Sequence, residues 1–349
     1  MTAWAVYGVE LPFGHDDREW WIDSTGRLTE VAIADAELLP GSYVLQGLVD
    51  AHAHPALAAG QAGPIALDRG AARANLIEWA RAGVTLIRDT GSPGGISLEL
   101  APEPGMPVLR AAGRFMAPSG RYFPELLVEP VEEEDLVTAA LAEISKGATW
   151  IKVIADFPDL TAGTPPEATY HLQAITELTQ AAHSAGARVA AHSTTHFATE
   201  LISAGVDSIE HGTGLGEEAI REMAQRGTAW TPTLAATLAM VPPEAPDELR
   251  QHMAEARERL SQLLPLAASL GVPVLAGTDV AGTLPQEVAL LSQLGLAPDQ
   301  ALAAASTWPR QYLGAAESTD IVTYRHDPRD DQEELANPAA VVVGGVRVR

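Results

Sequence analysis

The chain has 349 residues, a formal net charge of −24 and no cysteine. Such an acidic surface repels polyanions, which argues against nucleic acid and anionic membranes as partners. The lack of cysteine excludes disulfides, thiolate metal ligands and cysteine nucleophiles.

Residues 1–47 carry Trp, Tyr and Val residues with turn signals such as STGR, a pattern typical of short β-strands. The first residues show no basic segment followed by an apolar one, so no signal peptide is predicted. No apolar run reaches the length of a membrane span. We therefore expect a cytoplasmic protein.

From residue 44 to residue 314, short β-branched runs alternate with alanine- and leucine-rich amphipathic segments. Strands are predicted over residues 43–54, 84–91, 107–114, 149–156, 188–195, 208–213, 229–236 and 273–280. Helices are predicted over residues 69–83, 132–148, 168–186, 198–205, 217–227, 248–271, 284–295 and 298–314. Alternating β and α units predict an α/β fold, a (β/α)8 TIM barrel whose chemistry lies at the C-terminal ends of the strands.

The tail of the chain, with runs such as DIVTYRHDP and AAVVVGGVRVR, again has the pattern of short strands. We expect residues 1–47 and 315–349 to form a small β-sandwich domain. Residues 48–314 are expected to form the barrel beside it.

Lys152 lies inside TWIKVIADF, a predicted strand that is apolar on both sides in sequence. Barrel strands are covered by helices outside and by packed side chains inside, and burying an ammonium ion is costly. A lysine there should be neutral, ion-paired or chemically modified. Taken alone, an ion-paired lysine is the simpler interpretation.

Other predicted strands end in side chains that commonly bind metals: His52, His54, His192, His211 and Asp279. A closed barrel would bring the ends of strands one, four, five, six and eight around one axis. Imidazole and carboxylate suit zinc and other first-row divalent ions. Together with Lys152, these residues could serve two metals if CO2 converts the neutral lysine amine into a carbamate, whose two oxygens can bridge two cations.

The motifs GLVDAHAHP, TWIKVIADF, AAHSTTHFATELISAGVDSIEHGT and AGTDV together resemble the metal-dependent amidohydrolase superfamily over nearly the whole chain. AGVTLIRDTGS and AAGRFMAPSG are similar to the branch of imidazolonepropionase-like enzymes and Xaa-Pro or Xaa-Arg dipeptidases. The resemblance implies two divalent metal ions, with zinc favoured.

The resemblance also assigns roles to the six residues. It implies a more buried metal on His52, His54 and Asp279, a more exposed one on His192 and His211, and a bridging carbamate on Lys152. A hydroxide between the metals would attack a carbonyl carbon. Asp279 would act as the catalytic residue, first as general base and then as general acid toward the leaving nitrogen.

The candidate substrate-binding residues are Arg114, Arg121, Tyr122 and His196. The branch often has a tyrosine soon after the fifth-strand histidine and a Gly-Gly-His element after the third strand, where this chain has HSTTHFA and PSGRYF. Arg114 and Arg121 are equally compatible with binding a substrate carboxylate and with loop salt bridges. His196 is equally compatible with substrate binding and with a surface position.

Four charged residues near the strand ends are expected to support the site. Arg88 and Asp89 end the second strand, where we expect an internal ion pair. Asp50 and Glu210 each lie beside a histidine in an alternating strand, so they should point away from the cavity and act behind it.

The leading hypothesis is a binuclear hydrolase that cleaves a small amide: an N-acyl amino acid, a dipeptide or a cyclic amide. A lactone or organophosphate-ester hydrolase is the alternative, because the same metals polarise C=O and P=O bonds. Deaminases on this fold usually lack the strand-four lysine, so Lys152 argues against them. A non-catalytic relative would commonly have lost ligand residues. The expected partner is a small-molecule substrate, and the sequence is compatible with a homo-oligomer.

Overall fold

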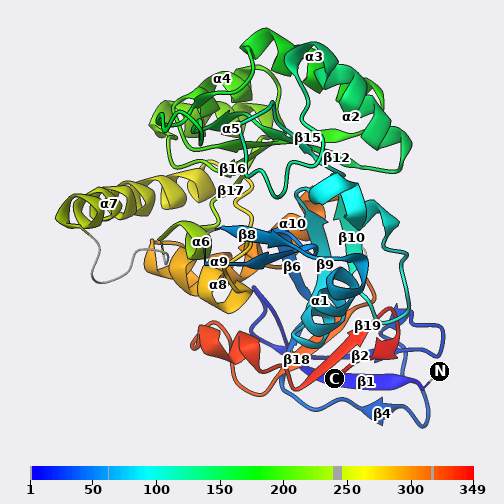
Figure 1. The fold of residues 1–349 in the computed structure, drawn as a ribbon. Coiled ribbons are helices and arrows are strands. Elements are labelled where there is room, and N and C mark those ends of the chain that lie inside the picture. Colours follow the sequence, from blue (N-terminus) through cyan, green and yellow to red (C-terminus); the bar gives the residue numbers. More distant parts are fainter. Residues whose placement is uncertain (1, 62, 239–245, 316–317) are drawn as a thin grey trace.

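The computed structural model describes residues 2–61, 63–238, 246–315 and 318–349 (Figure 1). Strands and helices alternate along most of these residues, which confirms the expected α/β class. Among the described residues, no helix combines the length and the apolar character that crossing a membrane requires.

Two parallel sheets contain the strands that carry the predicted site. One has the order β10 (Val108–Ala111), β9 (Val84–Asp89) and β6 (Leu48–Ala53). The other has the order β11 (Phe115–Met116), β12 (Trp150–Ile154), β15 (Arg188–Ser193), β16 (Ser208–His211) and β17 (Ala229–Thr231). Every residue of β6, β9, β12 and β16 is buried, as expected for parallel strands covered on both faces.

Two segments link these sheets. Residues 108–116 contribute β10 to the first sheet and β11 to the second. Residues 273–279 lie between β17 and β6: the Leu275 N–H donates to the Trp230 carbonyl at 2.8 Å, and the Ala51 N–H donates to the Ala276 carbonyl at 2.9 Å.

Residues 273–280 form isolated bridges and not the regular eighth strand that the sequence predicted. Asp279 has a φ of 55°, outside the extended region, so a continuous strand cannot run through it. The segment still pairs with its neighbours, because the Asp279 N–H donates to the His52 carbonyl at 2.7 Å.

Two other predicted strands have different boundaries. The strand expected over 43–54 is split at Gly47 into β5 (Tyr43–Leu45) and β6, because Gly47 has a φ of 104°. The strand expected over 229–236 ends with β17, since Pro232 and the positive φ of Thr233 interrupt it. Helix α6 (Leu234–Leu238) begins directly afterwards.

Most helices lie on the predicted segments, but the helix expected over 298–314 is divided into two, α9 and α10. Their bounds are α1 (Arg69–Arg81), α2 (Leu136–Ser145), α3 (Leu172–Ser184), α4 (Phe197–Ser203), α5 (Glu217–Arg226), α7 (Asp247–Ser269), α8 (Leu284–Gln293), α9 (Pro298–Ala304) and α10 (Thr307–Tyr312). Local chemistry sets several ends: Asp68 accepts a hydrogen bond from the Ala71 N–H at the start of α1, and Gly227 takes the left-handed conformation after α5. Short 3₁₀ helices occur at Pro93–Glu99, Glu133–Asp135 and Gln332–Ala336.

Both chain ends contribute to one eight-stranded sheet at the end of the molecule where the two termini lie (Figure 1). Its strands are β1 (Trp4–Glu10), β2 (Asp17–Ile22), β3 (Leu28–Thr29), β4 (Glu37–Leu38), β5, β18 (Ile321–Tyr324), β19 (Ala340–Val343) and β20 (Val346–Arg347). The two ends join where β18 pairs antiparallel with β5. Apolar residues from both ends form its core, among them Trp4, Trp20 and Val342.

Two short antiparallel pairs complete the described strands: β7 (Leu57–Ala59) with β8 (Pro64–Ala66), and β13 (Asp156–Phe157) with β14 (Glu167–Ala168). Each follows a central strand, β6 or β12, on the side where the predicted site residues lie.

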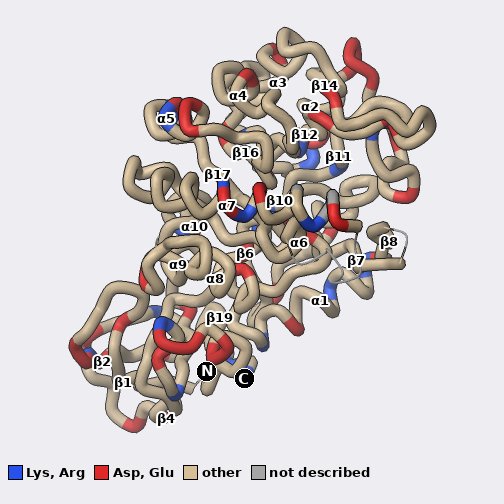
Figure 2. Tube along the Cα trace, turned by 90° about the vertical axis from the view of Figure 1, so that its left-hand side faces the viewer, with Lys and Arg blue, Asp and Glu red and all other residues tan. Residues whose placement is uncertain are grey.

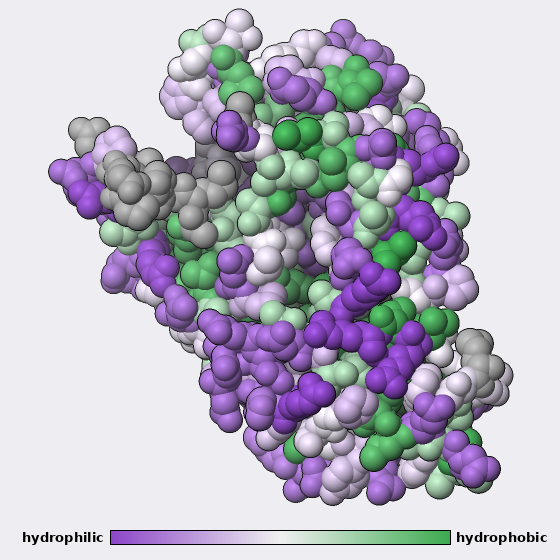
Figure 3. Space-filling model, turned by 60° about the horizontal axis from the view of Figure 1, so that its bottom comes forward, coloured by the Kyte–Doolittle hydropathy of each residue, from purple (hydrophilic) through white to green (hydrophobic). Residues whose placement is uncertain are grey.

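The acidic excess lies on the surface, and Figure 2 shows Asp and Glu residues spread over the outer helices and loops. Exposed large apolar side chains such as Phe13, Val31 and Val128 come from separate parts of the chain. On the face seen in Figure 3, hydrophobic residues are interspersed with hydrophilic ones.

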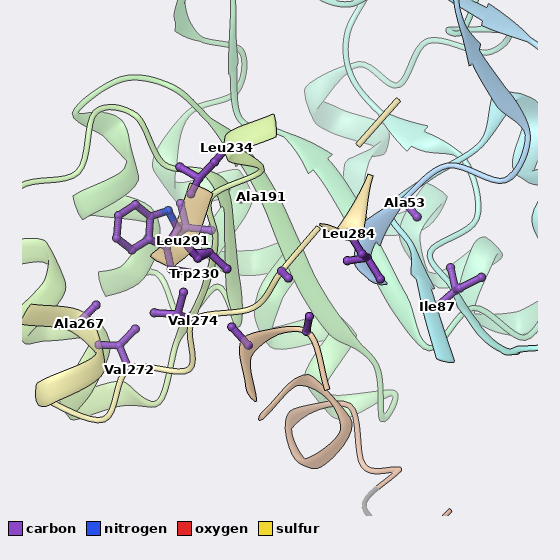
Figure 4. Close-up of a cluster of buried hydrophobic side chains, with 14 of the residues drawn as sticks. Ala53, Ile87, Ala191, Trp230, Leu234, Ala267, Val272, Val274, Leu284 and Leu291 are labelled. Carbon is purple, nitrogen blue, oxygen red and sulfur yellow. The ribbon is translucent and has the colours of Figure 1, made fainter. Parts of the chain in front are cut away.

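The largest buried cluster joins the central strands to the helices that cover them. Figure 4 shows Trp230 of β17 lying among Leu234, Val274 and Leu291. The indole N–H of Trp230 donates to the His211 carbonyl at 3.0 Å, so this packing also reaches a predicted site residue.

We predict that Gly47→Ala destabilises the protein by about 2–5 kcal/mol, since alanine would be strained at this φ and its Cβ would overlap Thr85. Gly94→Ala is the matched control: its φ is 61°, but no atom lies within 4 Å of the added Cβ, so only about 1–2 kcal/mol is expected. Urea denaturation of both variants measures the difference. Equal losses would contradict the packing role of Gly47.

Candidate metal centre and active site

A cavity of about 1110 Å³ opens where the central strands end at their C-termini. All six predicted metal-binding side chains line it: His52, His54, Lys152, His192, His211 and Asp279. They come from β6 and the residue directly after it, from β12, β15 and β16, and from the segment that follows α7, so residues far apart in sequence meet at one place.

Asp279 lies close to three of the four histidines. Its Oδ1 is 3.4 Å from His54 Nε2 and 3.9 Å from His52 Nε2, and its Oδ2 is 4.0 Å from His211 Nδ1. His52, His211 and Asp279 each offer a ligand atom within 4.8 Å of the others. The ring centroid of His192 is 4.5 Å from that of His211.

Hydrogen bonds behind the cavity orient the first two histidines. Nδ1 of His52 is 2.6 Å from Glu210 Oε2, and Nδ1 of His54 is 2.8 Å from the Gly91 carbonyl. Both acceptors require a proton on Nδ1, which leaves the Nε2 lone pair directed toward Asp279. Glu210 therefore has the supporting position expected from strand alternation.

The partner of Arg88 differs from the expected one. Arg88 pairs with Glu210, at 2.8 Å, and not with Asp89. Neighbouring residues of a strand point to opposite faces, so Arg88 and Asp89 cannot meet. Arg88 and Glu210 are fully buried, and the guanidinium lies 4.6 Å from the ring centroid of Trp150.

Backbone strain is concentrated at the site. Within the described part of the chain, four non-glycine residues have positive φ, and three of them lie here: His211 at 67°, Thr233 at 47° and Asp279 at 55°. His211 Nδ1 is 2.7 Å from the Thr233 hydroxyl, so two of these residues also touch. Such conformations cost about 1–3 kcal/mol each and persist only where the surroundings impose them.

Lys152 is 1% exposed, and its Nζ has no hydrogen-bond partner among the described residues. Burial lowers the pKa of Lys152 to about 8, although the nearby carboxylates of Glu210 and Asp279 act in the opposite direction. A neutral amine is therefore accessible close to neutral pH. An orphaned buried amine is costly, so the site favours a further partner or modification at this atom.

The other donors have the charge states that metal binding requires. Burial, followed by the charge of Lys152, lowers the pKa of His52 and of His192 to about 4. Burial alone would raise the pKa of Asp279, but its interactions with His54, His52 and His211 hold it well below its usual value. Neutral imidazoles with an ionised carboxylate fit divalent metal ions.

Asp156 organises the turn that follows His192, a role that the sequence reasoning missed. It accepts hydrogen bonds from the Ser193 hydroxyl at 2.5 Å, the Thr194 N–H at 2.8 Å and the Thr195 hydroxyl at 2.8 Å. The available signal was an acidic residue ending one buried strand with a Ser-Thr-Thr run ending the next.

Two of the four candidate substrate residues line the cavity: Tyr122 and His196. Tyr122 is buried among aromatic rings, with centroids 5.0 Å from Phe115 and 5.1 Å from Phe157. Burial raises the pKa of Tyr122, so its hydroxyl stays protonated and can donate a hydrogen bond into the cavity. His196 is exposed at the start of α4.

The two candidate arginines have other partners and do not line the cavity. Arg114 pairs with Glu129 and, at 3.5 Å, with Glu143. Arg121 pairs with Glu167 at 3.0 Å and donates to the Phe157 carbonyl at 2.8 Å. Both therefore have the loop salt bridges that were the other interpretation.

Comparison with known proteins identifies the family. The model of the amidohydrolase family matches residues 43–320. This chain belongs to the amidohydrolase family. It is accordingly a hydrolase that acts on C–N bonds.

The amidohydrolase chain is similar over most of its length to other proteins. Uncharacterized proteins of Mycobacterium tuberculosis and Mycobacterium bovis are 35% identical to it, covering 97% of this chain and 94% of theirs. A solved Xaa-Pro dipeptidase with bound methionine has a TM-score of 0.79 and 22% identity over 99% of both chains. The A. niger ochratoxinase has a TM-score of 0.79 and 16% identity over 99% of this chain and 96% of its own. These structural likenesses support the fold.

We predict that Arg88→Met destabilises the amidohydrolase by about 3–5 kcal/mol, because Glu210 would be left buried without its cation. The exposed pair of Arg221 with Glu217 provides the control, and Arg221→Met should cost at most about 0.5 kcal/mol. Urea denaturation measures both. A loss for Arg88→Met no larger than the control would show that the buried pair is not structurally required.

Proposed function

We propose that this amidohydrolase is a binuclear metal-dependent hydrolase that cleaves a small amide, such as an N-acyl amino acid, a dipeptide or a cyclic amide. One observation carries the proposal: the Nζ of Lys152, which has no partner in the described part of the chain, is buried in a cavity lined by four predicted ligand histidines and Asp279. A structural core has little use for Lys152 at this position, because an amine is costly to bury without a partner.

The residues that would hold the ions are those that the resemblance assigned: His52, His54 and Asp279 for one ion, His192 and His211 for the other, and carbamylated Lys152 between them. When bound there, two divalent ions, with zinc favoured, supply an activated water and polarise the substrate carbonyl. The orientation of His52 by Glu210 and of His54 by Gly91 supports this assignment.

The chain's own groups would move the protons. Asp279 is ionised and 23% exposed, so its carboxylate can accept a proton from the attacking water. It would then return that proton to the leaving nitrogen as the C–N bond breaks, which balances the addition of one water across the amide. Tyr122, with its protonated hydroxyl, would donate a hydrogen bond to the substrate.

The architecture proposed for this function is a (β/α)8 barrel of residues 48–314 that closes through residues 273–279. The hydrogen bonds of that segment to both β17 and β6 support closure. Residues 1–47 and 315–349 would form a separate small β domain around their shared sheet.

We predict that purified, metal-replete protein holds two metal equivalents per chain and hydrolyses N-acyl amino acids. Asp279→Asn should retain most of the metal but lower kcat by about 10²–10⁴-fold, because the proton acceptor is lost. Asp16→Asn, at an exposed site in the terminal region, is the control and should keep full activity. Elemental analysis measures the metal content, and a substrate panel of amides, lactones and phosphotriesters measures the hydrolysis rates. Folded protein without bound metal, or ester cleavage without amide cleavage, would overturn the proposal.

A second prediction concerns the carbamate. The sequence contains two lysines, Lys146 and Lys152, and the side chain of Lys146 is 58% exposed. Metal-replete protein prepared in ¹³C-bicarbonate should show one protein-bound carbamate resonance by NMR. The resonance should disappear in Lys152→Met together with activity, and persist in Lys146→Met. A signal that survives in Lys152→Met would assign the modification elsewhere.

A further inference from the structure

The described lining of the cavity lacks the acidic excess of the whole chain. The chain has a net charge of −24, yet Asp279 is the only carboxylate among the described residues that line the cavity. Two cationic side chains, Lys152 and Arg259, also line it. Since Asp279 and Lys152 belong to the predicted metal centre, Arg259 is the cation left to meet a substrate.

Arg259 belongs to α7 and is exposed toward solvent. Its Nη2 donates to the Thr213 carbonyl at 2.8 Å, in the loop that follows the predicted ligand His211. Within the described part of the chain it forms no ion pair, unlike Arg114 and Arg121. Its guanidinium is thus anchored beside the site by one hydrogen bond and keeps donors for another acceptor.

The two sides of the cavity differ in chemistry. After β11 and β12, the lining is aromatic: the ring of Phe123 lies 5.2 Å from Tyr122 and 5.3 Å from Phe157. Phe157 lies 5.6 Å from His192, so this aromatic wall begins at the predicted metal centre. On the side of α6 and α7, which lie near each other in Figure 1, the lining around Arg259 is aliphatic: Leu238, Met253, Ala256 and Leu260, with Leu215 from the loop after β16.

We propose, resting on the amide hydrolysis proposed above, that the substrate is an amide with a bulky apolar acyl group and a carboxylate on its amine side. The acyl group would pack against the aromatic wall of Tyr122, Phe123 and Phe157. The carboxylate would bind the guanidinium of Arg259, whose planar donors match its two oxygens. The scissile bond would then lie between the walls, at Asp279.

Binding tests the charge without requiring turnover. In the Asp279→Asn background, N-phenylacetylglycine and its neutral isostere N-isobutylphenylacetamide are titrated by calorimetry. Adding Arg259→Met should weaken N-phenylacetylglycine on the order of 10- to 100-fold, as expected for a lost charge-assisted hydrogen bond, and leave the isostere within about threefold. Arg257→Met on the same helix, where Arg257 donates to Gln293, is the matched control and should change neither.

The aromatic wall is tested by acyl size. Phe123→Ala should reduce the ratio of the affinities for N-phenylacetylglycine and N-acetylglycine, measured by the same calorimetry, on the order of tenfold, because apolar contact area is lost. Phe13→Ala, an exposed position in the terminal region, should leave the preference unchanged.

The outcomes separate this inference from the proposed function. Equal weakening of both ligands by Arg259→Met, or weakening of neither, overturns the carboxylate site. An unchanged acyl preference in Phe123→Ala overturns the aromatic wall. If Arg259→Met weakens N-phenylacetylglycine selectively but the wild-type protein cleaves no amide, the carboxylate site is supported and the hydrolysis is rejected. If the wild-type protein cleaves amides and Arg259→Met changes the cleavage of neither ligand, the hydrolysis is supported and the carboxylate site is rejected.

Discussion

Arg88 and Glu210 meet beneath the cavity with both side chains fully buried, and this pair connects the strands on which the site depends. The guanidinium of Arg88 on β9 contacts β6 through the Ala51 carbonyl and β17 through the Thr231 hydroxyl. Burial alone would raise the pKa of Glu210, yet the charge of Arg88 and the hydrogen bond from His52 hold it well below its usual value. Both charges of the pair are required, because removing either partner would leave the other buried without a counter-ion.

That pair makes the geometry of the first histidine a consequence of the fold. Glu210 holds Nδ1 of His52, so Nε2 can only face the cavity. Equivalent contacts fix His54 through Gly91 and His211 through Thr233. The cavity residues are thus positioned from behind, and the strained φ angles of His211 and Asp279 persist because these contacts over-determine the backbone.

The outer surface and the cavity lining differ in charge. Acidic residues are spread over the outer helices and loops, in keeping with the net charge of −24. The described lining of the cavity lacks this acidic excess, since Asp279 is its single carboxylate and Arg259 lies on the same lining. The low dielectric of buried surroundings strengthens these local charges relative to the screened surface field.

The sequence by itself determined the α/β class, because strand and helix periodicity are local properties of the chain. Its motifs indicated the family. The order of His52, Lys152, His192 and Asp279 at the ends of successive strands indicated which side chains converge. It also indicated that Glu210 acts behind the site, through simple alternation along a strand. Whether Arg114 and Arg121 face substrate or acidic neighbours could not be read from sequence, since their partners Glu129 and Glu167 lie in other loops. Tertiary structure decided three further features: the pairing of Arg88 with Glu210, the five hydrogen bonds that Asp156 accepts, and the position of Arg259 beside the cavity. Each depends on how separate elements pack in space.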